Sequence, residues 1–323
     1  MPKVSVVIIT YNQGQFIAEA IQSVLDQTLR DLEIIVIDDG STDNTREVVS
    51  PFPVTYFHQE NQGVCKAYNR GAALSTGEYI YFLDADDVAL KDALEKEVKV
   101  LDSHPEVAFS YGQAYVMTEQ GHVYRVRKSS ILNSSAIVDG KEQIRELLFI
   151  NRITSSTVLL RRRCFEEVGG FDERMGAISE DRHLYVRLCK RYPVAYIAEP
   201  LIKYRVHPEQ THKKVTYPVF EEAFSLILQE VFDDPAFSPE FQRLKKPAYS
   251  YTYRRVARYA YGKDMRVARN YMRKAFTVYP RIALQGEGLS LAYRYATSLL
   301  PDIMWQAADQ LKKRFWDSKR VSE

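Results

Sequence analysis

Short, continuous apolar runs alternate with segments of helical spacing through about the first ninety residues of the chain. The first run, KVSVVIIT at residues 3–10, is rich in β-branched residues, as is typical of a parallel strand covered on both faces. A turn cluster follows it, and then apolar residues recur at helical spacing. This alternation predicts βαβ units and a mainly parallel sheet in an α/β fold. The predicted strands here are 3–10, 32–37, 54–58 and 79–83, and the predicted helices include 16–25 and 62–75.

The chain beyond residue 90 mixes further strands with helices, and from residue 218 its pattern is helical alone. We therefore expect one large domain at 1–212 and a helical extension at 213–323. The predicted strands are 107–117, 123–126, 157–160, 195–198 and 201–206; the predicted helices are 91–103, 141–149, 164–168, 180–189, 219–232, 241–261, 265–279 and 301–315.

The composition is that of an ordinary globular protein, with 46% apolar and 27% charged residues. Its three cysteines are far apart, which argues against a disulfide framework or a zinc site. The charge is uneven, because residues 240–323 hold 18 basic and 7 acidic residues although the whole chain has a net charge of only +2. An acidic body with a basic extension indicates an anionic partner for the extension.

Two features bear on location. The chain starts Met-Pro-Lys and then enters a strand without the pattern of a signal peptide, and no apolar run approaches the length that spans a bilayer. We therefore expect a cytoplasmic protein. We also expect that it does not bind nucleic acid. Residues 282–316 are rich in aromatic and aliphatic side chains with basic residues at the end, which predicts peripheral contact with the inner face of an anionic membrane. Packing on the body of the protein or on a second subunit of a homo-oligomer is the alternative.

Polar residues recur where the predicted strands end: Thr10-Tyr11-Asn12, Asp38-Asp39 and Asp84-Ala85-Asp86-Asp87. In open α/β sheets, ligands bind at the carboxyl ends of the strands. Crowded carboxylates repel one another unless a cation or hydrogen bonds hold them, and such oxygen ligands suit Mg²⁺ or Mn²⁺ with a shared phosphate. A solvated strand-to-helix turn is the simpler alternative for the acidic cluster. The absence of a G-x-G-x-x-G or Walker A motif argues against a dinucleotide dehydrogenase and a P-loop NTPase.

Three later motifs add candidate residues. Gly169-Gly170-Phe171-Asp172 predicts a shaped loop, because paired glycines permit conformations that other residues avoid. Glu180-Asp181 opens a predicted helix, and His207 follows Tyr204-Arg205 at the end of the last strand. We expect Asp38 to support its turn and Asp87 to cap the next helix or support the cluster. The turn after Asp39 offers Ser41 or Thr42 as a helix cap.

Taken in order, these motifs resemble family 2 glycosyltransferases with the GT-A fold, over roughly residues 3–212. The resemblance rests on VVIITYN, VIDDGSTD, NQG and NRG, GEYIYFLDADD, GGFD, ED and YRVH. It implies an inverting enzyme, dependent on Mn²⁺ or Mg²⁺, that moves a sugar from a nucleotide-diphosphate donor to a saccharide or lipid-linked acceptor. UDP-sugars are the commonest donors in the family, and cell-surface polysaccharide or glycan synthesis is a frequent role.

The resemblance also implies roles for the matching positions. Thr10, Tyr11, Asn12 and Asp39 would hold the nucleoside, Arg70 the base or phosphates, and Asp84 the ribose or sugar hydroxyls. Asp86 and His207 would ligate the metal. Asp181 would be the catalytic base, with Glu180 and the loop residues Gly169, Gly170 and Phe171 on the acceptor side.

Two other functions compete with this interpretation. A nucleotide-sugar-binding protein without transferase activity would keep the same binding residues. A phosphohydrolase with Asp84 as nucleophile would also place D-x-D after an apolar strand. It is disfavoured because such enzymes use the first strand, whereas this strand is the fourth.

Overall fold

The computed structural model describes residues 1–176, 178–210 and 217–281. These residues form two compact units. Of the described residues, the first unit holds those up to 210 and 225–231, and the second holds 217–224 and 232–281. The predicted domain boundary after residue 212 stays a prediction. The predicted helix 301–315 and the proposed membrane-contact segment 282–316 lie outside the described residues.

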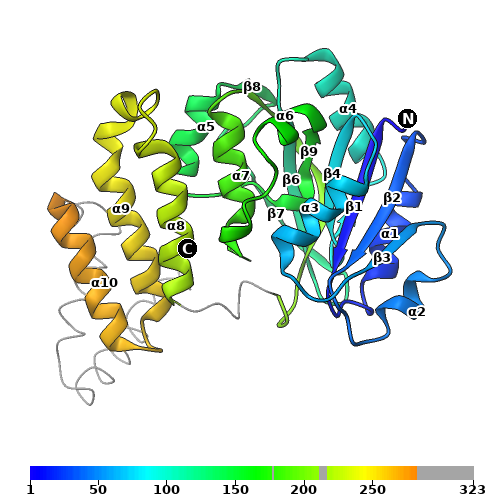
Figure 1. The fold of residues 1–323 in the computed structure, drawn as a ribbon, viewed down its shortest axis with the longest axis horizontal. Helices are drawn as coiled ribbons and strands as arrows, with labels where there is room; N and C mark the ends of the chain where they lie inside the picture. Colours follow the sequence, from blue (N-terminus) through cyan, green and yellow to red (C-terminus); the bar gives the residue numbers. More distant parts are fainter. Residues whose placement is uncertain (177, 211–216, 282–323) are drawn as a thin grey trace, which may run out of the picture. The chain divides into compact units, whose positions relative to one another are not determined.

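The first unit is an α/β structure built on one large sheet (Figure 1). Helices α1, α3 and α4 follow strands early in the chain, as the alternating pattern predicts. In chain order the elements are β1 (Val4–Thr10), α1 (Ile17–Leu25), β2 (Leu32–Asp38), α2 (Thr45–Val49), β3 (Thr55–His58), α3 (Val64–Leu74), β4 (Tyr79–Asp84), β5 (Val88–Ala89), α4 (Ala93–Ser103), β6 (Phe109–Thr118), β7 (Val123–Arg127), β8 (Ala136–Val138), α5 (Gly140–Leu147), η1 (Ser155–Thr157), β9 (Val158–Arg161), α6 (Arg162–Glu167), η2 (Glu173–Met175), α7 (Glu180–Cys189) and β10 (Val194–Val206).

The strand order explains why the site lies where it does. The sheet runs β3-β2-β1-β4-β9-β6-β10-β5, with β7 on β6 and β8 on β10. β1, β2, β3 and β4 are parallel to one another, and β6 is parallel to β10. Thr10 pairs with Asp38 on β2, and Ile9 pairs with Asp84 on β4. The polar ends of three strands therefore lie at one edge of the sheet.

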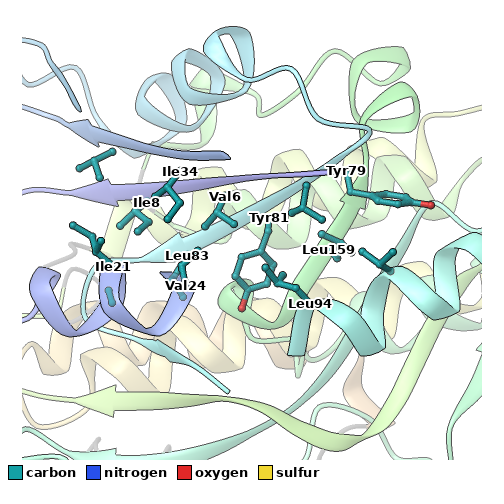
Figure 2. Close-up of a cluster of buried hydrophobic side chains, with 14 of the residues drawn as sticks. Val6, Ile8, Ile21, Val24, Ile34, Tyr79, Tyr81, Leu83, Leu94 and Leu159 are labelled. Atoms are coloured by element: carbon teal, nitrogen blue, oxygen red, sulfur yellow. The ribbon is translucent and has the colours of Figure 1, made fainter. Parts of the chain in front are cut away.

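The core explains the continuous apolar runs. Val6 and Ile8 of β1 are fully buried in a cluster that includes Ile21 and Val24 of α1 (Figure 2). On the other side of β1, α3 packs so closely that a Cβ at Gly71 would lie 2.2 Å from Val7 Cγ1. Each buried Val or Ile side chain stabilises the fold by about 1.5–3 kcal/mol. Because both faces of β1 are covered, this strand lacks the alternation of a half-exposed strand.

Two local predictions were wrong, and two short strands were not predicted. The two strands expected at 195–198 and 201–206 are one strand, β10, whose register with β6 shifts around Pro200. Proline lacks the N–H that a regular ladder needs, so the shift lets the strand continue past it. Ser41 and Thr42 do not cap α2, which begins at Thr45; the Asp43 carboxylate accepts from the Thr45 N–H (3.0 Å). β5 and β8, of two and three residues, were too short to leave a pattern.

The second unit is helical, as predicted. It contains much of α8 (Tyr217–Phe232), together with α9 (Ser238–Ala260) and α10 (Met265–Val278). α9 and α10 pack through small residues such as Ala257 and Ala268, and the Asp264 carboxylate caps α10 by accepting from two backbone N–H groups. Among the described residues, no helix combines the length and the apolar character needed to span a bilayer.

Candidate active site

Asp39 anchors the loop after β3. Its buried carboxylate accepts from the Gln59 side chain (2.8 Å) and from the backbone N–H groups of Gln62 and Gly63 (both 2.9 Å). The Asp39 N–H in turn donates to the Thr10 carbonyl (2.9 Å). An ionised carboxylate offers about four acceptor positions, so one remains for a ligand.

The end of β1 contacts the turn that follows β2. Asn12 has a φ of 54°, its N–H donates to Ser41 Oγ, and its side-chain oxygen accepts from the Thr42 N–H (both 2.8 Å). The buried Thr10 hydroxyl finds no hydrogen-bond partner within the described part of the chain, whereas Tyr11 is 49% exposed. A buried, unpaired hydroxyl is costly, so Thr10 is suited to a ligand contact.

The other two predicted residues near this edge have different surroundings. Asp38 supports its turn as expected, because its carboxylate accepts from the Ser41 N–H (2.8 Å). Arg70 lies on the exposed side of α3 with its guanidinium 4.5 Å from the centre of the Phe57 ring. No hydrogen bond or ion pair in the described chain joins Arg70 to another predicted site residue, so its place in the site rests on the motif alone.

The acidic cluster forms at the end of β4. One carboxylate oxygen each from Asp84, Asp86 and Asp87 lies within 4.8 Å of the others. His207, at the end of β10, places Nε2 2.9 Å from Asp86 Oδ2 and packs its buried ring against Phe16. Carboxylate oxygens with one imidazole are a donor set that fits Mn²⁺ or Mg²⁺. The structure thus brings together the predicted metal ligands, which come from distant parts of the chain.

Asp84 is the most elaborately held member of the cluster. Its carboxylate accepts from the Tyr68 hydroxyl (2.6 Å) and from Ser155 Oγ (3.0 Å). Burial, and then the charge of Asp86, raises the pKa of Asp84 to about 6 against these two hydrogen bonds. A carboxyl group with two protein donors and a raised pKa is positioned to accept from sugar or ribose hydroxyls.

Asp87 is buried and holds the cluster together. It accepts from the Arg205 N–H (3.0 Å), and burial followed by the charges of Asp86 and Asp84 raises its pKa well above the ordinary range. It does not cap the next helix, whose N-terminal cap position is Asp92. The Arg205 side chain donates to the Asp86 carbonyl (2.9 Å), so Arg205 fixes the loop from both sides.

The predicted base lies in the first turn of α7. Asp181 accepts from the Arg182 N–H (2.6 Å) and from Asn151 Nδ2 (2.8 Å). Burial raises the pKa of Asp181, although both hydrogen bonds and the positive charges of Arg182 and Arg127 oppose the shift. Burial and the charge of Asp181 raise the pKa of Glu180 to about 8. The two adjacent carboxyl groups therefore disfavour each other's ionised form, and the pKa of both is raised.

A small cavity, lined mostly by apolar and aromatic residues, lies between the Asp181 carboxylate and the two side chains that donate to Asp84. It has a volume of about 10 Å³, which is roughly the space of one water molecule. Asp181 lines it together with Tyr68 and Ser155, the two residues that donate to Asp84. The two predicted groups, almost one hundred residues apart in sequence, thus share one region of the fold.

The glycine loop forms a firm wall beside this region. The Asn69 side chain donates to the Phe171 carbonyl and accepts from the Phe171 N–H (both 2.9 Å). Phe171 is buried and stacks on Tyr68 at 4.7 Å. Gly170 has a φ of 68°, and a Cβ there would lie 2.7 Å from Asn69 Oδ1. Gly169 also has a positive φ of 77°. The two glycines are therefore needed for the turn, and Phe171 serves the packing of the wall.

Several residues of the site were not found from the sequence. Asn151 and Ser155 lie between the motifs and belong to no recognisable sequence pattern. Asn69 is part of the NRG motif with Arg70, and Tyr68 precedes it. Arg205 is part of the Tyr204-Arg205-Val206-His207 motif, yet only the structure shows what it holds. These residues position the predicted groups.

The sequence is related to known glycosyltransferases. The family model described as Glycosyl transferase family 2 matches residues 5–169. An uncharacterized glycosyltransferase of Rickettsia felis is 32% identical over 221 residues, which are 67% of this chain and 36% of that protein. The chain spans about a third of the length of this relative and of those from Rickettsia conorii and Rickettsia bellii.

Two solved structures have the same fold. TarS of S. aureus, residues 1–349 in complex with UDP-GlcNAc, superposes with a TM-score of 0.69 at 18% identity, over 92% of this chain and 90% of that chain. The mannosyltransferase PcManGT of Pyrobaculum calidifontis, in complex with GDP-Man and Mn²⁺, has a TM-score of 0.54 at 21% identity, over 98% and 88%. The chain belongs to glycosyl transferase family 2 and has the GT-A fold of a glycosyltransferase.

Proposed function

We propose that this chain transfers a sugar from a nucleotide-diphosphate donor, a UDP-sugar in the first instance, to a saccharide or lipid-linked acceptor with inversion at the anomeric carbon. The observation that carries the proposal is that Asp181 and the two partners of Asp84 line one cavity, while Asp86, two residues after Asp84, contacts His207. The neighbouring folds in complex with UDP-GlcNAc, and with GDP-Man and Mn²⁺, support a nucleotide sugar and a divalent metal.

We assign binding of the nucleotide-sugar donor to residues at the carboxyl ends of the strands. Asp86 and His207 are the proposed metal ligands, and a bound divalent ion would neutralise the charge that grows on the leaving diphosphate. Asp84 accepts from a ribose or sugar hydroxyl. Asp39 uses its remaining acceptor position on the base. The residues proposed to complete the nucleotide contacts are Thr10, Tyr11, Asn12 and, for the base or phosphates, Arg70.

The proton transfer is assigned to Asp181. As the acceptor oxygen bonds to the anomeric carbon, the bond from that carbon to the diphosphate oxygen breaks, and the acceptor proton passes to Asp181. Inversion follows when the acceptor attacks the face opposite the leaving group. Asn151 donates to the carboxylate and favours its ionised form. Glu180, whose pKa is raised to about 8, keeps a proton at neutral pH and donates a hydrogen bond to the acceptor.

The cellular role proposed is synthesis of a cell-surface polysaccharide or glycan, with the basic extension drawn to the inner face of an anionic membrane. Arg243, Lys246 and Arg258 are exposed on α9, whereas no large apolar side chain of α9 or α10 is exposed among the described residues. Flotation of the full chain with anionic and neutral vesicles tests this part. Recovery with anionic vesicles alone, lost at high salt, supports it; absence from both contradicts it.

The transferase proposal is tested by a donor screen. Thermal-shift measurements with Mn²⁺ and a set of UDP-, GDP- and other nucleotide sugars identify the donor, and turnover is then measured over a broad acceptor panel. Asp86→Ala and Asp181→Asn are compared with the wild type. Near-normal transfer by both variants would overturn the proposal. Tight donor binding without turnover by the wild type would favour the nucleotide-sugar-binding alternative.

A further inference from the structure

β7 is an exposed strand that carries two arginines and is followed by a lysine. Residues 120–138 contain Arg125, Arg127 and Lys128 but no Asp or Glu. Within the described chain, β7 pairs with β6 alone, and no acidic side chain forms an ion pair with these three cations. Arg125 and Lys128 are exposed. Arg125 and Lys128 therefore present positive charge to the solvent.

Exposed apolar and aromatic groups accompany this charge. Val123 and Val126 are each 44% exposed and Tyr124 is 55% exposed, although large apolar side chains on the rest of the first unit are mostly buried. The Arg125 guanidinium lies 5.9 Å from the centre of the Tyr124 ring. A tyrosine ring offers an apolar face and a polar tip, which suits a sugar ring with both C–H and hydroxyl groups.

The end of β7 reaches the proposed site of transfer. The Arg127 guanidinium lies 5.4 Å from the centre of the Tyr204 ring, three residues before His207. Its positive charge also acts on the Asp181 carboxylate. Since Asp181 is proposed to take the proton of the acceptor hydroxyl, the charge of Arg127 on this carboxylate favours the acceptor side of the site for β7.

We propose that β7, through Tyr124, Arg125 and Arg127, forms with the adjoining Lys128 an acceptor subsite that selects saccharides bearing an oxyanion, a carboxylate or a phosphate. The proposal rests on the function proposed above and adds the class of acceptor. Arginine binds carboxylate and phosphate oxygens through paired N–H donors, so both sources of the oxyanion share one chemistry. The simpler explanation is that cations on an edge strand only discourage pairing with other chains. That explanation predicts no preference among sugars.

The test is a saturation-transfer NMR titration of the full chain held at saturating UDP and Mg²⁺. The probes are methyl glucuronide, glucose 6-phosphate and the neutral methyl glucoside. We expect at least one anionic sugar to bind more tightly than the neutral one, with the preference declining at high salt. The carboxylate and phosphate arms identify the source of the oxyanion. Equal affinity for all three sugars, or no binding of either anionic sugar, would overturn the proposal.

Variants test whether the preference for anionic sugars arises at β7. The double variant Arg125→Gln/Lys128→Gln should weaken binding of the anionic sugar roughly three- to tenfold. The control, Arg46→Gln/Lys99→Gln, removes the same charge from exposed positions on α2 and α4 and should leave the affinity unchanged. Equal weakening by the control would show a general charge effect and would contradict the subsite.

The variant Arg127→Gln distinguishes an effect on acceptor binding from an effect on donor binding. It should weaken the anionic sugar and leave the affinity for UDP within about twofold, since β7 is assigned to the acceptor. If the UDP affinity falls as much as the sugar affinity, Arg127 binds the diphosphate and the subsite is wrong. Failure of the transferase proposal has a different signature: UDP binding by the wild type would not depend on the divalent ion.

Discussion

Asn151 should set the pH at which Asp181, the proposed base, becomes active. Its Nδ2 donates to Asp181 Oδ2 at 2.8 Å, while Oδ1 accepts from the Ile153 N–H at 3.1 Å. A hydrogen bond to the carboxylate stabilises the ionised form and lowers its pKa. Removing the donor should therefore raise the pKa of Asp181 further above its ordinary value. Because Asp181 must be ionised to accept the proton, the acid limb of kcat/KM should move to higher pH.

The size of the expected pKa shift follows from the strength of the hydrogen bond between Asn151 and Asp181. Hydrogen bonds to charged groups contribute about 1.5–3 kcal/mol, and one pKa unit corresponds to about 1.4 kcal/mol. Asp181 is partly exposed, so water replaces part of the lost bond and the lower end applies. Asn151→Ala should shift the acid limb upward by about one pH unit. Well above the limb, kcat/KM should match the wild type.

Two further variants distinguish this electrostatic role from a merely structural one. Asn151→Asp keeps the shape and the acceptor for Ile153, but replaces the donor with a negative charge. It should shift the limb at least as far as Asn151→Ala, whereas a structural role predicts the smaller effect for Asp. Asn270→Ala makes the same truncation on the exposed surface of α10 and should not shift the limb. The assay is kcat/KM for donor turnover from pH 4.5 to about 9. Wild-type limbs in both Asn151 variants would refute the reasoning.

Three other changes probe the metal, the acceptor side and the wall. Asp86→Asn should weaken the metal-dependent affinity for UDP on the order of 100-fold, measured by calorimetry with and without Mn²⁺; unchanged affinity would remove Asp86 from the metal site. Glu180 has a pKa raised to about 8 and should lose its hydrogen-bond donor above that pH, so kcat/KM should fall on the alkaline side. Glu180→Gln keeps a donor and should abolish that limb, and an unchanged limb would argue against the role. Asn69→Ala removes both bonds to the Phe171 backbone and should lower the free energy of unfolding by about 1–3 kcal/mol in denaturant titrations; no loss would contradict the clamp.

The fold was predictable where one physical pattern dominates. The run at β1 is continuous because both faces are buried, and its register with β2 and β4 brings the acidic strand ends to one edge. β10 was divided in error because Glu199-Pro200 resembles a break, and pairing with β6 overrides the local signal. β5 and β8 are held by pairing with β10, so their short sequences carry little information.

The candidate site was predictable where chemistry is concentrated in a motif. The contact of His207 with Asp86 followed from the resemblance, and the proximity of Asp181 to Asp84 follows from strand ends and a helix start that only the fold brings together. Asn151 could not be found, because a single amide in a loop has no spacing or charge signal. Arg70 illustrates the reverse: its motif is clear, yet its guanidinium packs on Phe57 at the surface.

The central claim is that one set of residues binds the donor and another residue, Asp181, accepts the proton. Its most direct test is Asp181→Asn, with UDP affinity in the presence of Mn²⁺ and the rate of sugar transfer measured on the same preparation. The variant keeps the size of the side chain. Asp181 lies in α7, whereas Asp86 and His207 follow β4 and β10, so the UDP affinity should stay within about twofold of the wild type. Loss of the base should reduce transfer by about 10²–10⁴-fold. Near-normal transfer, or a loss of UDP affinity that matches the loss of rate, would contradict it.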